Sequence, residues 1–274
     1  MQRWTMRNRS KKYNYKIAMF RGDTPRPKKN EVVIVPNDNR LLDIAPYAAQ
    51  GNLPSWWKDL PVKDMSLRRC NGTYDYLQYG FIIPMWTDVT VRPDASGVRF
   101  EYKLGNYGDD YAFHVDGFST EMAKGCPFGE NRKLKNFNYP KLVTPWRYFT
   151  PKGISLMALP ILHEPNPNYT VMPGIVHTDY YNQLHIVISV LTDKEFTIPA
   201  GTPMQHMVPI KRNENIKKLV FGNESMSRFH IGNGMGKEIG KGSLSQQDNS
   251  QLYRRIRMKY DQDIERKKWY SLRR

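Results

Sequence analysis

A series of short apolar runs, each ended by glycine or proline, lies between Pro145 and Arg212 and constrains the fold most strongly. Three turn-like motifs separate the runs: Thr-Pro-Lys-Gly-Ile-Ser (150–155), Gly-Ile-Val-His-Thr-Asp-Tyr (174–180) and Ile-Pro-Ala-Gly-Thr-Pro-Met-Gln (198–205). The strands predicted from this pattern cover 154–159, 170–176, 184–191, 196–198 and 204–210. Because no amphipathic crossover helix separates them, we expect an all-β barrel or sandwich and not a parallel α/β sheet.

Further segments before residue 105 extend the β-rich pattern. Residues 31–36 predict a short buried strand, 79–91 a strand bent at Pro84, and 97–104 a strand whose period-two alternation places one face in the core. The strands at 79–91 and 97–104 together suggest an antiparallel pair. Residues 53–61 predict a proline-bracketed turn with two tryptophans that pack on the body, and 105–141 predict long loops.

The formal net charge of +16 is concentrated at the two ends of the 274-residue chain. Residues 1–29 carry +9 (ten basic, one acidic), residues 254–274 carry +6 (nine basic, three acidic), and residues 30–253 carry only +1 (23 basic, 22 acidic). The organisation that we predict is a basic extended arm (1–29), an all-β domain (30–212), a glycine-containing linker (213–244) and a basic amphipathic helix (245–274).

The two basic ends are the candidate partner-binding segments. The arm mixes cations with aromatic rings, and in the helix an apolar stripe recurs every four residues at Leu252, Ile256, Tyr260 and Ile264. The candidate contact residues are Arg3, Trp4, Arg7, Arg9, Lys11, Lys12 and Tyr13 in the arm and Arg254, Arg255, Arg257, Lys267, Lys268 and Trp269 in the helix. This composition suits an arm buried on a neighbouring subunit, which we favour, and it also suits stacking on single-stranded nucleic acid.

Cysteine usage and hydropathy exclude several classes of protein. Cys70 and Cys126 lack a Cys-x-x-Cys partner, so we expect reduced, packed cysteines and neither a disulfide framework nor a thiolate zinc site. The sequence contains no apolar run of about 18 residues and no secretory signal pattern, which predicts a soluble protein made in a cytoplasm without a membrane partner.

Several motifs, taken in order over residues 53–212, resemble an uncharacterised family of proteins found largely in tailed bacteriophages, especially marine ones. The motifs are Leu-Pro-Ser-Trp-Trp-Lys (53–58), Arg-Cys-Asn (69–71), Gly-Phe-Ile-Ile-Pro-Met-Trp-Thr-Asp (80–88), Pro-Trp (145–146), Thr-Pro-Lys-Gly-Ile-Ser (150–155) and the run 198–212. The chain departs from the family at Asn71, where proline is usual, and at His177, where an acid is usual. The resemblance implies a viral context: location in the host cytoplasm, other phage proteins as partners, and incorporation into the virion as an open alternative.

A second resemblance covers 153–212 and concerns the central hairpin of trimeric dUTP pyrophosphatases, which have a β-clip, jelly-roll-like fold. Those enzymes use an Asp to activate water, a Tyr to stack near the sugar, an Arg-Ser-Gly segment for phosphates and an aromatic in a glycine-rich C-terminal arm. By this resemblance Tyr180 matches the stacking tyrosine and Asp179 a structural acid, while His177 stands at the water-activating Asp. Residues 160–163 stand where the phosphate segment should be, and the glycine-rich run 232–242 has no aromatic.

These departures favour a protein without enzymatic activity. An imidazole in place of a carboxylate beside a metal-bound triphosphate changes the local charge by one unit, and the phosphate segment is also missing. Our main hypothesis is a phage structural or assembly protein that self-associates, as a trimer by analogy, with no cofactor and no metal. One alternative is a dUTPase-like nucleotide-binding protein or altered pyrophosphatase that uses Mg²⁺ and a pocket of His177, Asp179, Tyr180 and Gln205. Another is nucleic-acid binding through the basic ends.

Two further candidates rank lower. His177 and Asp179, with His185 or His206, would share a strand face as a metal site, but histidines in strands are more often core or surface residues. The glycine-rich run at 232–236 lacks the preceding strand that a phosphate loop needs, so we expect a hinge or linker there.

Overall fold

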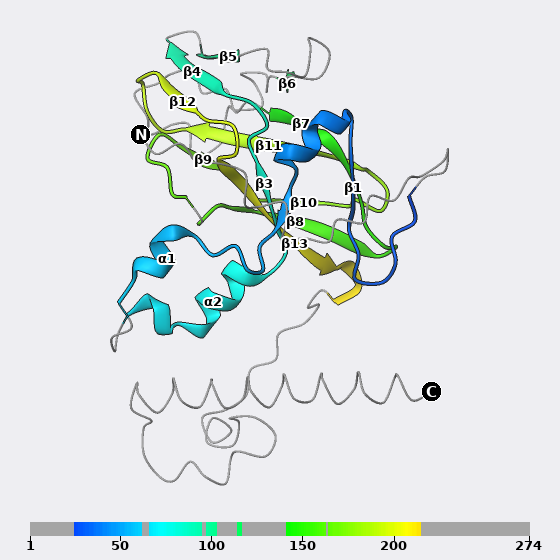
Figure 1. Ribbon diagram of the computed structural model, residues 1–274. Helices are drawn as coiled ribbons and strands as arrows, with labels where there is room; N and C mark the ends of the chain where they lie inside the picture. The colour runs from blue at the N-terminus through cyan, green and yellow to red at the C-terminus, as the bar shows by residue number, and fades with distance from the viewer. Residues whose placement is uncertain are drawn as a thin grey trace, which may run out of the picture. The chain divides into compact units, whose positions relative to one another are not determined.

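The described part of the chain is built mainly from antiparallel β-strands with few, short helices (Figure 1). The structure is a computed structural model, and it describes residues 25–61, 66–94, 97–102, 114–116, 141–162 and 164–214. Within these ranges the strands form three sheets, none of which closes into a barrel. The expectation of a β-rich chain with antiparallel sheets is therefore confirmed.

Several predicted features lie outside the described residues. They are residues 1–24 of the basic arm, most of the loops at 105–141, Cys126, residues 215–244 of the linker, the helix at 245–274, and all the candidate contact residues in the two ends. These features stay predictions.

The chain divides into two compact units. Of the described residues, those at 25–55 and 77–214 belong to one unit, which holds the three sheets, and those at 56–61 and 66–76 belong to the other. The candidate site below lies wholly within the first unit.

Sheet A is centred on the two long strands β7 and β11. Its strands are β1 (Val33–Pro36), β6 (His114–Asp116), β7 (Lys141–Phe149), β9 (Tyr169–Val171) and β11 (Gln183–Val190), in the order β1-β7-β11-β9 with β6 also paired to β7. Alternate residues of β7, from Leu142 to Tyr148, are buried, while Lys141, Val143, Arg147 and Phe149 are half-buried. This period of two gives the sheet one core face and one outer face.

Sheet B carries the candidate site. Its strands are β2 (Tyr47–Ala48), β3 (Phe81–Pro84), β8 (Ile154–Pro160), β10 (Gly174–Val176) and β13 (Pro203–Lys211), in the order β10-β8-β13-β3-β2. The longest pairing joins β8 and β13, from Ile154 opposite Lys211 to Pro160 opposite Gln205. In Figure 1 these two strands and β3 cross the middle of the unit.

The single strand predicted at 170–176 is wrong, because the chain leaves one sheet and enters another there. β9 ends at Val171 in sheet A and β10 begins at Gly174 in sheet B. Pro173 lies between them and has no N–H to continue a ladder, which explains the break.

Sheet C is the antiparallel pair that the period-two pattern predicted, with one added strand. It contains β4 (Val89–Asp94), β5 (Gly97–Tyr102) and β12 (Phe196–Ile198), in the order β12-β4-β5.

One apolar cluster joins the inner faces of the sheets. It includes Leu142 and Ile186 from sheet A, Ile83 and Leu156 from sheet B, and Val89 from sheet C, all with no exposed surface. Large rings fill its centre: Phe81 stacks on Tyr148 with ring centroids 6.1 Å apart, and Trp86 meets Trp146 edge-on at 5.8 Å. Burial of these rings and of the surrounding apolar side chains stabilises the sheets.

The helices are short. They are α1 (Ser55–Asp59), α2 (Asn71–Gln78) and the 3₁₀ turns η2 (Asn39–Ile44), η3 (Leu67–Arg69) and η4 (Arg212–Glu214). The predicted turn at 53–61 therefore contains a helix, in which Trp57 is buried and its ring centroid lies 6.1 Å from that of Tyr74. None of the helices in the described ranges is long and apolar enough to cross a membrane.

Cys70 is exposed, so the expectation that it packs in the interior is wrong. It lies directly before α2, where the hydroxyl of Thr73 donates a hydrogen bond to its Sγ at 3.2 Å. That hydrogen bond lowers the pKa of the Cys70 thiol.

Gly80 is required where the chain enters β3. Its φ is +77°, and a Cβ there would lie 2.0 Å from the carbonyl oxygen of Met207 on β13.

We predict that Gly80→Ala lowers the free energy of unfolding by about 3 kcal/mol or more, measured by chemical denaturation, because backbone strain and steric overlap with the Met207 carbonyl add. The matched control is Gly72→Ala in α2, where a Cβ meets nothing within 4 Å. It should be neutral or stabilising by up to about 1 kcal/mol, and equal effects of the two substitutions would contradict this account.

Candidate functional site

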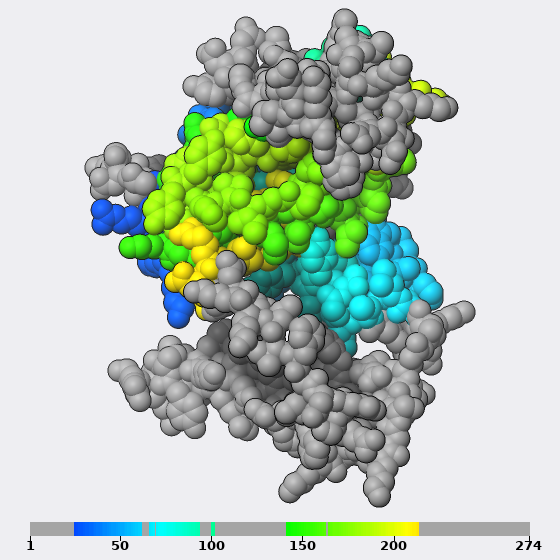
Figure 2. Space-filling model, turned by 180° about the vertical axis from the view of Figure 1, so that it is seen from behind, coloured from blue at the N-terminus to red at the C-terminus, as the bar shows by residue number. Residues whose placement is uncertain are grey.

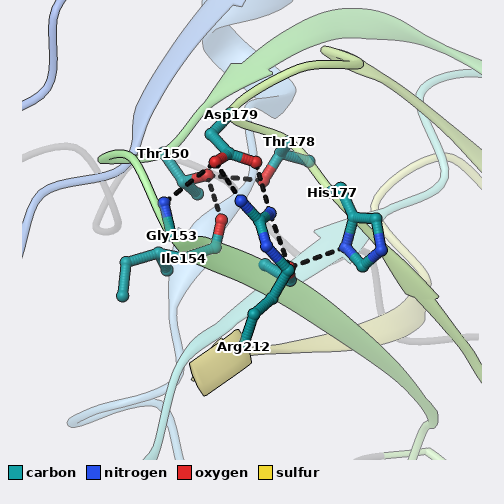
Figure 3. A network of polar contacts seen from close by, with 8 residues as sticks. Thr150, Gly153, Ile154, His177, Thr178, Asp179 and Arg212 are labelled. Atoms are coloured by element: carbon teal, nitrogen blue, oxygen red, sulfur yellow. Dashed lines mark hydrogen bonds and ion pairs between the residues drawn. The ribbon is translucent and has the colours of Figure 1, made fainter.

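A polar cluster forms where three segments of the first unit meet at one end of sheet B (Figure 3). The segments are the turn between β7 and β8, the turn that follows β10, and the end of β13 with η4. Figure 2 shows the end of the described chain, in yellow, at the surface beside the green and yellow-green strands.

The centre of the cluster is an ion pair between Asp179 and Arg212. The Arg212 guanidinium donates from Nη1 to Oδ1 at 2.5 Å and from Nη2 to Oδ2, and the backbone N–H of Gly153 donates to Oδ2 at 2.9 Å. The Asp179 side chain is 4% exposed and that of Arg212 is 23% exposed. The hydrogen bonds from Arg212 outweigh burial and lower the pKa of Asp179.

Arg212 also connects the ion pair to His177 through Ser155. Its Nη1 donates to the Ser155 hydroxyl oxygen at 3.1 Å, and that oxygen lies 2.8 Å from Nδ1 of His177. Because arginine only donates, the Ser155 hydroxyl proton remains available, and Ser155 can donate a hydrogen bond to Nδ1 of His177. Ser155 is fully buried, so it is not placed to attack a substrate.

A pair of threonine hydroxyls joins the first two turns beneath this network. Thr150 Oγ1 donates to the carbonyl oxygen of Ile154 at 2.8 Å, and Thr178 Oγ1 lies 2.8 Å from it. Because the hydroxyl proton of Thr150 is donated to Ile154, the hydroxyl of Thr178 is the donor in the hydrogen bond between the two threonines. Both threonines are buried.

Two tyrosines follow the cluster and face solvent. Tyr180 is 77% exposed, and the guanidinium carbon of Arg212 lies 5.3 Å from its ring centroid. Tyr181 is 52% exposed and stacks on His185, with centroids 6.3 Å apart and planes 20° apart. These rings are the large apolar groups that the cluster presents to solvent.

The predicted pocket is only partly assembled. His177, Asp179 and Tyr180 come together, but Gln205 pairs with Pro160 on β8, five residues from Ser155 in the ladder. At about 3.3 Å per residue this separates Gln205 from the cluster by roughly 16 Å. Gln205 is buried and its Oε1 has no hydrogen-bond partner, so it belongs to the interior of the sheet.

Four residues of the cluster had no predicted role: Thr150, Ser155, Thr178 and Arg212. They lie in motifs that the sequence does single out, at 150–155, 174–180 and the end of 198–212, but their pairing depends on strand register. Within the described ranges, no three His, Cys, Asp or Glu side chains are grouped to hold a metal ion.

The polar groups of the cluster bind one another and hold three segments of the chain together. We call the Asp179–Arg212 ion pair, with the hydrogen bond from Gly153, the clasp. Both carboxylate oxygens of Asp179 accept hydrogen bonds from Arg212, and Oδ2 accepts another from Gly153. A general base needs a lone pair directed at water or substrate, and the lone pairs of Asp179 that accept these hydrogen bonds are directed into the network.

Comparison with known proteins gives little further guidance. No protein-family model matches the chain, and no curated protein matches its sequence. Among solved structures, a point mutant of the dUTPase of Staphylococcus bacteriophage 80alpha is similar at a TM-score of 0.30 and 9% identity, over 72% of this chain and 99% of that one. This likeness is too weak to assign a fold family or an activity.

We predict that Asp179→Asn lowers the free energy of unfolding by about 2–3 kcal/mol, because it leaves the guanidinium of Arg212 in a largely buried position without its carboxylate. The control is Glu195→Gln, which breaks an ion pair with Arg92 whose side chains are 56% and 47% exposed. The Glu195→Gln substitution should lower the free energy of unfolding by less than about 1 kcal/mol. Urea denaturation checks both, and an Asp179→Asn variant as stable as the control would contradict the clasp.

The same pair predicts a specific acid sensitivity. The pKa of Asp179 is lowered by folding from 3.8, so its contribution is fully present above that value and is lost as the pH falls towards the lower folded pKa. Unfolding curves between pH 5 and pH 2 should therefore fall more steeply with acid for the wild type than for Asp179→Asn. Parallel curves would show that Asp179 titrates alike in both states.

Proposed function

We propose that this chain is a non-enzymatic structural or assembly protein of a tailed bacteriophage that self-associates through sheet B. The β-clip or jelly-roll-like architecture, the trimer and the viral context come from the resemblances in the sequence and are part of the proposal. Its basic ends would contact neighbouring subunits or other phage proteins in the host cytoplasm or in the virion.

The observation that carries the proposal is how the Asp179–Arg212 clasp uses its polar groups. Asp179 is 4% exposed and held at both oxygens, and His177 faces the buried Ser155 through Nδ1. In the described structure Asp179 and Arg212 are engaged with each other, while His177 is exposed and meets Ser155 through Nδ1. This supports a structural use of the site.

The surface suited to self-association is an uncharged row across the outer face of sheet B. Ile175 lies opposite Met157 on β8, which lies opposite Val208 on β13. Cross-strand partners share a face, so the three side chains are neighbours. Ile175 is 56% exposed and the other two are half-buried.

A second copy of this chain fits the row better than a charged partner does. Residues 196–210, which include most of β13, contain no Asp, Glu, Lys or Arg, so two copies can approach without charge repulsion. In the described sheet β10 is an edge strand paired with β8, and an edge can pair with the same edge of another copy. Apolar burial and strand pairing then act together.

We predict that the full chain is oligomeric by size-exclusion chromatography with light scattering, and that Ile175→Lys weakens association by roughly 100-fold or more. A lysine there would place an unpaired charge in an apolar interface. Because Ile175 is 56% exposed, the variant should remain folded, with a thermal unfolding midpoint lowered only by the association that is lost. The control is Leu42→Lys in η2, where Leu42 is 42% exposed, and it should leave the oligomer intact. A monomeric wild type, or equal effects of the two lysines, would contradict the proposal.

The nucleotide-binding alternative is favoured by one observation, the exposed ring of Tyr180 braced by Arg212. We predict that dUTP and other dNTPs with Mg²⁺ leave the thermal unfolding midpoint unchanged, because Arg212 and Asp179 are engaged with each other. A rise in the midpoint that requires both nucleotide and Mg²⁺ would support that alternative, since a ligand stabilises the state that binds it.

A further inference from the structure

Tyr180 and Tyr181 form a pair of exposed rings whose positions are fixed from below. The guanidinium of Arg212 lies under the ring of Tyr180, and the imidazole of His185 stacks on the ring of Tyr181. With 77% and 52% of the two residues exposed, each ring has its other side open to solvent. We name these two residues the tyrosine platform.

The backbone under the platform is held by several hydrogen bonds. The N–H groups of Tyr180 and Tyr181 both donate to the carbonyl oxygen of His177, at 3.0 and 2.8 Å, and the carbonyl oxygen of Asn182 accepts from Tyr148 at 2.7 Å. The Asp179–Arg212 ion pair fixes the turn from the other side. A ligand that stacks on these rings therefore does not have to order the loop, which lowers the entropic cost of binding.

The charge around the platform is positive. Arg212 lies under Tyr180, Arg147 donates to Gln183 at 3.0 Å, and the exposed Lys152 precedes Gly153, whose N–H binds Asp179. Against these three cations the contacts include one carboxylate, Asp179, which gives a net charge of +2. Two copies facing each other here would repel, unlike at the uncharged row of sheet B.

We propose that the tyrosine platform binds single-stranded nucleic acid by stacking bases on Tyr180 and Tyr181, with Lys152 and Arg147 near the phosphates. Open aromatic faces next to cations are the two features that such binding uses, and stacking accepts any base. The proposal is independent of self-association, and it places binding on the folded body and not on the basic ends.

The test uses the full chain and an oligonucleotide of about 12 nucleotides, mostly thymidine, with a central 2-aminopurine. Stacking quenches 2-aminopurine fluorescence, so binding to the platform should quench it, whereas contact with phosphates alone should not. A duplex of the same sequence should show no added quenching, because its bases are already stacked.

Substitutions then assign the quenching to the two rings. Tyr180→Ala and Tyr181→Ala should each weaken binding roughly 5- to 150-fold and together abolish the quenching, while Tyr180→Phe should retain it. The control is Tyr79→Ala, which removes a tyrosine that is 60% exposed and lies before β3, in a different segment of the chain from the platform. Unchanged thermal unfolding midpoints would show that the variants are folded.

Salt dependence tests the phosphate contact. Lys152→Gln should reduce the slope of log affinity against log salt by about one, as expected for one lost phosphate contact. Quenching that persists in the double alanine variant would overturn the proposal and assign stacking to rings elsewhere, such as those of the basic arm. Absence of quenching in the wild type would overturn it as well.

Discussion

The ion pair between Asp179 and Arg212 is the interaction on which this end of the molecule depends. It joins the turn after β10 to η4 at the end of β13, and the backbone N–H of Gly153 brings in the turn before β8. Three segments are thus held at one carboxylate, with Gly153 26 residues before Asp179 and Arg212 33 residues after it. Both charges are largely removed from water, so loss of either one would leave the other buried and uncompensated, which is destabilising. The ion pair therefore stabilises the three segments together.

The sequence predicted the strands whose side chains alternate and missed the elements that lack this pattern. β5 and β12 occur within a residue or two of their expected bounds because their periodicity and their turns agree. β7 was not predicted, since Lys141, Pro145 and Arg147 interrupt its apolar residues and its inner face includes Thr144, which donates to the carbonyl oxygen of Leu184. α2 was missed for a similar reason: Asn-Gly-Thr-Tyr-Asp-Tyr-Leu-Gln has little apolar periodicity, and Leu77 is its one fully buried residue.

The candidate site was predictable only where its members are close in sequence. His177, Asp179 and Tyr180 share one turn, so a motif could identify them. Arg212 and Gln205 both follow in the 198–212 run, and the sequence favoured Gln205, yet the register of β13 against β8 places Gln205 opposite Pro160 and carries Arg212 to the other end, beside Ser155. That register is set by which face of each strand is buried along its whole length, a property that a local motif does not contain.

The imidazole at position 177 is compatible with the clasp in a way that a carboxylate would not be. Nδ1 of His177 lies 2.8 Å from the Ser155 hydroxyl oxygen, which accepts from Arg212, so an uncharged imidazole there can accept a hydrogen bond from Ser155 without adding charge. A carboxylate in its place would lie next to a serine already bonded to Arg212, two residues from Asp179, and the two acids would compete for one guanidinium. Competition of this kind raises the pKa of one acid and weakens the hydrogen bonds from Arg212 to the other. With an uncharged ring at position 177, Asp179 is the carboxylate that pairs with Arg212, while Arg212 also donates to Ser155, and the turn that presents Tyr180 and Tyr181 keeps its shape.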